Sequence, residues 1–81
     1  MQVQVQFFAQ LRDAAGTSDL ELDLPEHATV AHLLAKLFAE IPALKSWDGK
    51  ILIGVGVEFV GRDYVLQPNE TVAIMPPVQG G

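Results

Sequence analysis

The last two residues of the chain are Gly80 and Gly81, and the apolar run before them closes on Pro76-Pro77-Val78. Glycine has no Cβ and has wide freedom of φ and ψ, so a pair of glycines is the narrowest peptide that a protein can present. We expect such a tail to enter a slot that excludes side chains and to offer its terminal carboxylate to the chemistry of another protein. For the dipeptide taken alone, a merely flexible end is the alternative.

No other group of residues has the spacing of a catalytic or metal site. His27 and His32 are five positions apart at the start of a predicted helix, without an acid or a cysteine at ligand spacing, so we interpret them as surface histidines near the helix cap. The sequence has no Ser-His-Asp arrangement, phosphate-binding loop or Glu-x-x-His motif. We therefore expect any reactivity to lie at the terminal carboxylate.

The composition bounds the class of protein. The 81 residues, 49% of them hydrophobic and 19% charged, predict one folded domain over residues 1–81 with a flexible tail at 76–81. No apolar run reaches the roughly 18 residues of a membrane span, and Met1-Gln2-Val3-Gln4 lacks the basic start of a signal peptide. We expect a cytoplasmic protein that does not contact a membrane.

Charge and cysteine content exclude further functions. Without cysteine the chain has no disulfide, thiolate ligand or cysteine nucleophile. The net charge of −5 disfavours binding to a phosphate backbone, so no nucleic-acid partner is expected. An acidic protein of this size is better suited to a basic protein partner.

Hydrophobic periodicity predicts an α+β fold in the order β-β-α-β-β-β. Alternating residues indicate strands, and Thr29 is a favourable N-cap for a helix whose apolar stripe ends before Pro42. One helix suffices to cover one face of one mixed sheet. The predicted strands cover residues 3–7, 19–24, 50–57, 64–66 and 71–75. The first two are expected to pair as an antiparallel hairpin with a long loop between them.

The apolar residues of these elements define a predicted core. Glycines at 54 and 56 share the opposite face of the third strand, which indicates a bulge or, less readily, a close approach by another chain. The residues predicted to be buried are Val3, Val5, Phe7, Leu20, Leu22, Leu24, Val30, Leu33, Leu34, Leu37, Phe38, Ile51, Ile53, Val55, Val57, Leu66, Val72 and Ile74.

Phe8 and Met75 are apolar but fall on strand faces opposite the core. If the first and last strands pair, the two side chains lie together, and with Leu52 and Gly54 they form an exposed apolar patch suited to docking. Burial of two such side chains contributes roughly 3–6 kcal/mol. Arg12 could add a charged contact at the edge, whereas scattered surface hydrophobics are the alternative.

Two motifs resemble the family of small subunits of molybdopterin synthase. They are Phe7-Phe8-Ala9-Gln10-Leu11-Arg12-Asp13 and the ending Val72-Ala73-Ile74-Met75-Pro76-Pro77-Val78-Gln79-Gly80-Gly81. The resemblance spans the whole chain and implies a ubiquitin-like β-grasp fold and a sulfur carrier. The sequence departs from the family pattern at Gly56, where asparagine is usual, at Asp13, where glutamate is common, and in the turn at 67–70.

The resemblance also implies a reaction cycle. An E1-like activating enzyme uses ATP to adenylate the Gly81 carboxylate, a sulfur donor converts it to a thiocarboxylate, and the large synthase subunit receives the tail in a heterotetramer. Gly80 then serves to thread the tail, the segment from Pro76 to Gln79 contacts the partner, and the chain itself binds no cofactor. A thiamine-pathway sulfur carrier, a ubiquitin-like modifier of lysines and a plain binding module remain as alternatives.

Overall fold

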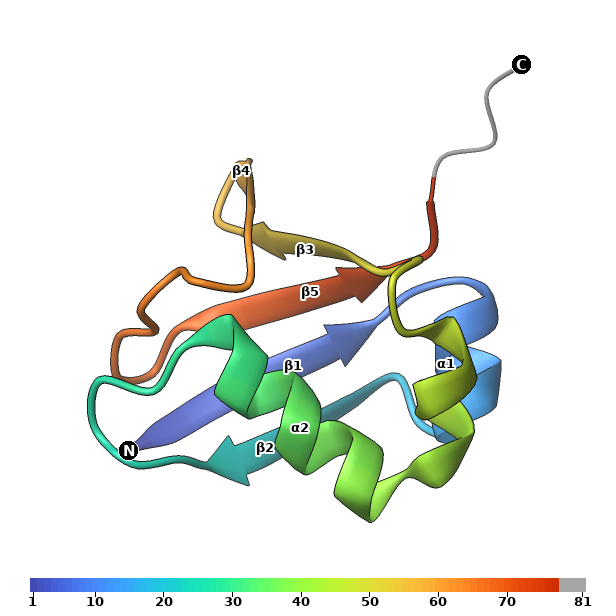
Figure 1. Ribbon diagram of the computed structural model, residues 1–81, viewed down its shortest axis with the longest axis horizontal. Coiled ribbons are helices and arrows are strands. Elements are labelled where there is room, and N and C mark those ends of the chain that lie inside the picture. Colours follow the sequence, from blue (N-terminus) through green and yellow to red (C-terminus); the bar gives the residue numbers. More distant parts are fainter. Residues whose placement is uncertain (78–81) are drawn as a thin grey trace.

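Residues 1–77 of the protein are described by a computed structural model, in which a helix lies across one face of a five-stranded sheet (Figure 1). The strands run in the order β2-β1-β5-β3-β4. Their bounds are Gln2–Phe7 (β1), Asp19–Asp23 (β2), Leu52–Val55 (β3), Glu58–Val60 (β4) and Thr71–Met75 (β5). The helices are Gln10–Ala15 (α1), Val30–Glu40 (α2) and the 3-10 helix Pro42–Trp47 (η1).

The two strands at the centre of the sheet come from opposite ends of the chain. β1 pairs with β5 in parallel and with β2 in an antiparallel hairpin, while β3 pairs antiparallel with both β5 and β4. The predicted hairpin, the pairing of the first and last strands and the α+β class with a mixed sheet are therefore confirmed. No helix within residues 1–77 combines the length and the apolar character needed to cross a membrane.

Strand alternation decides which residues enter the core between the sheet and α2. Along β1 the side chains are alternately exposed and buried, with Val3, Val5 and Phe7 inside. The predicted core residues Leu20, Phe38, Ile51 and Val55 are only partly buried, although they pack against it. Those confirmed as buried are Val3, Val5, Phe7, Leu22, Leu24, Val30, Leu33, Leu34, Leu37, Ile53, Leu66, Val72 and Ile74.

The start of α2 is fixed by the predicted cap. The hydroxyl of Thr29 accepts from the backbone N–H of His32 at 3.4 Å, and the Nδ1 of His32 accepts from the backbone N–H of Thr29 at 3.0 Å. This reciprocal pair satisfies two backbone donors that the first turn leaves unpaired. His32 is thus a capping residue, as interpreted from the sequence, whereas the exposed His27 lies in the preceding turn with a φ of 67°.

Two helices were not predicted. The region between the first two strands was expected to be a loop, but residues 10–15 form α1, which is closed by Gly16 in the left-handed conformation. The second is η1, which begins at Pro42 and follows α2 directly. Each contributes one fully buried leucine that the predicted core omits, Leu11 and Leu44, and Ala28 is a further omission.

The predicted third and fourth strands are wrong in their bounds. β3 ends at Val55, and a tight turn at Gly56-Val57 leads into β4, so the chain reverses where a continuous strand to Val57 was expected. Val57 is fully exposed at this turn, not part of the core. β3 pairs with both neighbours in unbroken register, which contradicts the predicted bulge. Residues 64–66 form only an isolated bridge, between Val65 and Thr29.

Candidate functional site

The tail leaves the fold at the end of the central strand β5. Met75 is the last residue of that strand, and Pro76 and Pro77 follow it without regular structure. The backbone N–H of Phe8 donates to the carbonyl of Ile74 at 3.1 Å, so Phe8 lies beside the start of the tail. The predicted tail residues Val78, Gln79, Gly80 and Gly81 lie outside the described residues, and their roles stay predictions.

The structure brings the predicted docking residues together on the face of the sheet opposite α2. Leu52 is directly opposite Met75 across the β3–β5 pair, and both are half-buried, while Phe8 is 44% exposed. Gly54 is buried, because the Met75 side chain lies over it: a Cβ on Gly54 would be 3.0 Å from the Cε of Met75. The predicted apolar patch is therefore present, but Gly54 lies buried beneath the Met75 side chain and is not an exposed member of it.

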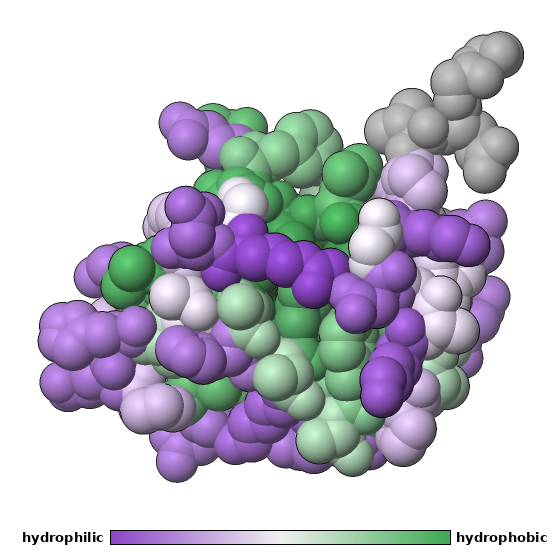
Figure 2. Space-filling model, in the orientation of Figure 1, coloured by the Kyte–Doolittle hydropathy of each residue, from purple (hydrophilic) through white to green (hydrophobic). Residues whose placement is uncertain are grey.

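A groove runs across this patch, which we call the outer groove. It is bounded by Phe8 and Met75 near the tail and by the β3–β4 hairpin on the other side. Its lining residues are Phe8, Gly54, Gly56, Val57, Glu58, Phe59, Ala73 and Met75. Figure 2 shows hydrophobic residues gathered over β3, β4 and the end of β5.

Phe59 and Val57 are members of this surface that the sequence interpretation missed. The Phe59 side chain is 67% exposed, and Phe59 is opposite Gly54 across the β3–β4 pair. The signal that could have found it is the alternation Glu58-Phe59-Val60 directly after a glycine-containing turn. Exposed aromatic side chains are enriched among interface anchors, so Phe59 belongs with the candidate docking residues.

The rest of the same face is polar. β1 contributes glutamines and β2 contributes acids, and the Nε2 of Gln4 donates to the Oε2 of Glu21 at 2.6 Å. Arg12 is exposed on α1 and lines a small pocket with Phe8 and Asp19, at the edge where a charged contact was predicted. No ion pair of Arg12 occurs within residues 1–77.

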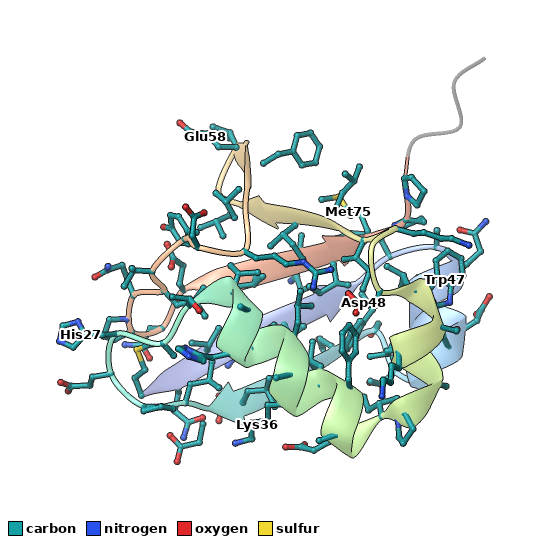
Figure 3. The ribbon with its side chains drawn as sticks, viewed as in Figure 1. His27, Lys36, Trp47, Asp48, Glu58 and Met75 are labelled. Carbon is teal, nitrogen blue, oxygen red and sulfur yellow. The ribbon has the colours of Figure 1, made fainter. Side chains whose placement is uncertain are left out.

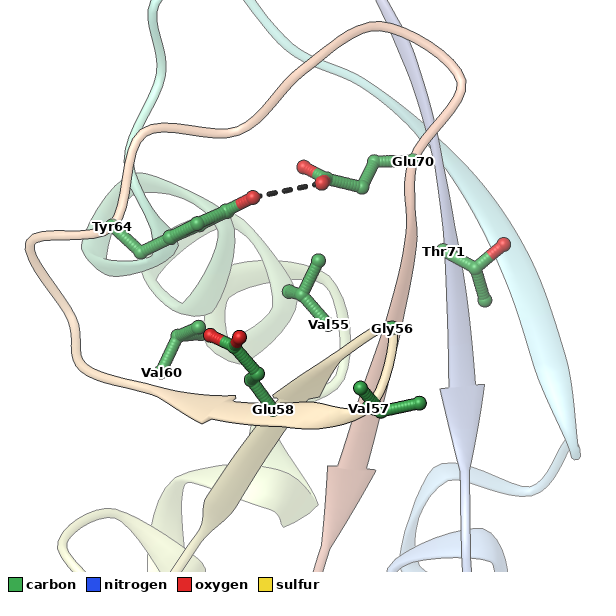
Figure 4. Close-up of a pocket in the computed structure, with 8 residues that line it drawn as sticks. All are labelled: Val55, Gly56, Val57, Glu58, Val60, Tyr64, Glu70 and Thr71. Carbon is green, nitrogen blue, oxygen red and sulfur yellow. Dashed lines mark hydrogen bonds between the residues drawn. The ribbon is translucent and has the colours of Figure 1, made fainter.

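A second groove, which we call the inner groove, lies on the core side of the same hairpin (Figure 4). The Oη of Tyr64 donates to the Oε2 of Glu70 at 2.8 Å, and the backbone N–H of Gln67 donates to the other carboxylate oxygen at 2.9 Å. The hydrogen bond to Glu70 raises the pKa of Tyr64 above its usual value, and desolvation and the charges of Glu70 and Glu58 act in the same direction. The residues that line the inner groove are Val55, Gly56, Val57, Glu58, Val60, Tyr64, Glu70 and Thr71.

The described side chains offer no alternative centre of chemistry. Within residues 1–77 there is no cluster of His, Asp or Glu able to hold a metal ion, and no buried side-chain polar atom lacks a partner. His27 lies at the opposite end of the molecule from Met75 (Figure 3). Among the residues that the structure describes, the candidate site is therefore the outer groove beside Pro76, where the tail begins.

Comparison with known proteins agrees with this arrangement. Residues 5–81 match the model of the ThiS family. The chain is 38% identical to the molybdopterin synthase sulfur carrier subunit of Escherichia coli (98% of this chain and 99% of that protein) and 34% identical to that of Chlamydomonas reinhardtii (all of both). The crystal structure of small archaeal modifier protein 1 from Haloferax volcanii superposes with a TM-score of 0.86 at 27% identity, over 95% of this chain and 98% of that one.

Proposed function

Because the chain belongs to the ThiS family, whose match extends through Gly81, we propose that it is a sulfur carrier of molybdopterin synthase. The observation that carries the proposal is similarity over the full length of the chain to proteins named as sulfur carrier subunits of that enzyme. The ubiquitin-like β-grasp architecture, with β5 leading into the tail beside an apolar groove, supports it.

The proposed reactive group is the carboxylate of Gly81. With a pKa of about 3.5 it is an anion at neutral pH, and an anion resists attack by a nucleophile. An activating enzyme therefore joins a carboxylate oxygen to the α-phosphorus of ATP and releases pyrophosphate. A donor of sulfide-level sulfur then attacks the acyl carbon, AMP leaves with the carboxylate oxygen, and a thiocarboxylate remains.

The large subunit of the synthase is the proposed acceptor of this tail. The thiocarboxylate sulfur forms a carbon–sulfur bond with the cyclic pyranopterin precursor as a carbon–oxygen bond of the precursor breaks and its oxygen leaves. Water then cleaves the resulting thioester, which leaves sulfur on the precursor and restores the Gly81 carboxylate. Two rounds supply both sulfurs of the dithiolene, which fits a heterotetramer of two small and two large subunits. The chain supplies no catalytic side chain to these steps and binds no cofactor in this scheme.

Docking at the outer groove would offset the cost of ordering the tail. Fixing the backbone of one residue costs about 1–2 kcal/mol, so a tail of several residues needs a separate source of binding free energy. Phe8, Phe59 and Met75 together expose enough apolar surface to contribute several kcal/mol when a partner covers them. Arg12 lies at the rim of this surface and is placed to contact an acid of the partner.

The test is the intact mass of the protein after co-expression with its activating enzyme. We expect a gain of about 16 mass units, because one carboxylate oxygen is replaced by sulfur. Deletion of Gly81 should abolish this gain and the synthesis of molybdopterin, with an unchanged thermal unfolding curve. If the truncated protein restores molybdoenzyme activity to a strain that lacks this subunit, the proposal is wrong.

A second candidate is a modifier that is joined to lysines by an isopeptide bond. The similarity to small archaeal modifier protein 1 favours it, because that protein has the same fold at nearly full coverage. The same mass experiment separates the two: a covalent adduct on a lysine of another protein indicates a modifier. Thiocarboxylate formation followed by delivery to a thiazole precursor, and not to the pyranopterin, indicates the thiamine-pathway alternative.

A further inference from the structure

The two grooves of the molecule meet at one turn. Gly56, Val57 and Glu58 line both the outer groove and the inner groove. Because side chains alternate along β4, that of Phe59 lies on the outer side of the hairpin and those of Glu58 and Val60 lie on the inner side. Glu58 borders the outer groove through its backbone carbonyl, which is 3.8 Å from where a Cβ on Gly54 would be. The β3–β4 hairpin, which projects from the sheet in Figure 1, therefore has a groove on each side.

The inner groove has the lining that suits the side chain of a basic residue. In Figure 4 the carboxylate of Glu70 adjoins the Tyr64 hydroxyl, and the carboxylate of Glu58 lies across the groove, beside Val60 on the hairpin. Valines 55 and 60 and the Tyr64 ring form apolar walls that fit a methylene chain or the face of a guanidinium. The hydrogen bond to Glu70, and to a smaller extent the charges of Glu70 and Glu58, raise the pKa of the Tyr64 hydroxyl, so Tyr64 is neutral and adds no positive charge to the groove.

No cation of the described chain neutralises the carboxylates of Glu58 and Glu70. Within residues 1–77 neither Glu58 nor Glu70 has a basic group within 4 Å. Arg62, which lies on the neighbouring turn, pairs instead with Asp48 at 2.6 Å. Glu70 is held in place by its two hydrogen bonds, so the groove offers at least one carboxylate in a fixed position to an incoming donor.

We propose that the large synthase subunit grips the β3–β4 hairpin on both faces, with apolar side chains in the outer groove and a lysine or arginine in the inner groove. This inference rests on the proposed function, since a protein that holds the tail after Met75 must cover the outer groove that Met75 lines. The turn at residues 56–58 lines both grooves, so a partner that covers the outer groove reaches the inner groove across this turn. Complementarity with an acidic, partly apolar groove requires a cationic contact at that position.

The experiment measures the dissociation constant of the full-length protein and its cognate large subunit by titration at 50 mM and 500 mM salt. Glu58→Gln should weaken binding about two- to fivefold at low salt, and Glu58→Lys should weaken it about tenfold or more. Both effects should shrink at high salt, because ions screen the contact. The Glu58 side chain makes no hydrogen bond within residues 1–77, so the unfolding temperature should be unchanged.

Glu40→Lys is the matched control, because Glu40 is also exposed but lies at the end of α2, outside both grooves. It should change the affinity less than twofold. If Glu58→Lys binds like the control while Phe59→Ala weakens binding, only the outer face docks, and the two-sided grip is wrong although the carrier function stands. If Glu58→Lys weakens binding to the activating enzyme alone, the assignment to the large subunit is wrong. Failure of the carrier function itself would appear separately, as absence of the thiocarboxylate mass.

Discussion

A valine at position 80 would place a branched side chain next to the residue whose carboxylate is proposed to react. In the proposed function the tail enters a narrow active site, and only glycine leaves the backbone without a Cβ. We expect Gly80→Val to block adenylation or transfer while the free energy of unfolding stays the same, because the described core is formed by residues between Val3 and Ile74. The readouts are thiocarboxylate yield by intact mass and turnover by the reconstituted synthase. Normal values for both would show that no narrow channel exists.

Individual candidate docking residues could be predicted from the sequence where apolar and polar side chains alternate regularly along a strand. Phe8 and Met75 follow from the alternation of the first and last strands, since the buried residues of those strands fix the opposite face. Phe59 did not follow, because its strand begins only after a turn that the sequence does not mark clearly. Val57 occupies that turn, and a β-branched residue is typical of strands, so the apolar run appears continuous.

At the scale of elements, the β3–β4 turn depends on the backbone of Gly56. Its φ of 63° is disfavoured for L-residues with a Cβ, although no atom lies within 4 Å of where a Cβ would be. We expect Gly56→Ala to cost about 1–2 kcal/mol of unfolding free energy through backbone strain alone, whereas Gly56→Asn costs less, because asparagine tolerates positive φ. Chemical denaturation measures both. Equal stability of the alanine variant and the parent would mean that the turn relaxes without strain.

The helices that were not predicted from the sequence are too short to show a hydrophobic periodicity. α1 has a single buried residue, Leu11, so no apolar stripe marks it; Gly16 at its end was the available signal. α2 was predicted correctly because its stripe extends over several turns and Thr29 caps it. Residues 64–66 alternate like a strand, but their backbone bonds go to Ala28 and Val30 at the start of α2, a tertiary pairing that no local pattern reveals.

At the scale of the whole molecule, the core and the proposed docking surface lie on opposite faces of the sheet. One face packs against α2 and holds the core, while the opposite face carries the outer groove beside the tail. The hairpin β3–β4 is the only described element that contributes to the lining of both grooves through the same residues, 56–58. A partner can therefore cover recognition surfaces without disturbing the core. Substitutions at neighbouring residues should therefore differ in effect: that of a buried residue should change stability, and that of an exposed residue should change binding.

Phe7 and Phe8 test this division most directly, because they are adjacent and chemically identical. Phe7 is 2% exposed and Phe8 is 44% exposed. Truncation of Phe7 to alanine should cost about 3–5 kcal/mol of unfolding free energy, a large part of the stability of a domain of this size. Phe8→Ala should leave stability within about 1 kcal/mol and weaken binding to the large subunit by at least about 1 kcal/mol.

Because Phe7→Ala could unfold the domain, Phe7→Leu supplies a milder core variant whose affinity can be measured. It should lower the unfolding temperature while the dissociation constant for the large subunit stays that of the parent, since Phe7 lies inside the sheet–helix core and does not line the outer groove. Thermal unfolding and titration of the two variants, Phe7→Leu and Phe8→Ala, then give opposite patterns. If Phe8→Ala instead destabilises the fold and keeps full affinity, Phe8 is a core residue, and the outer groove is not the docking surface.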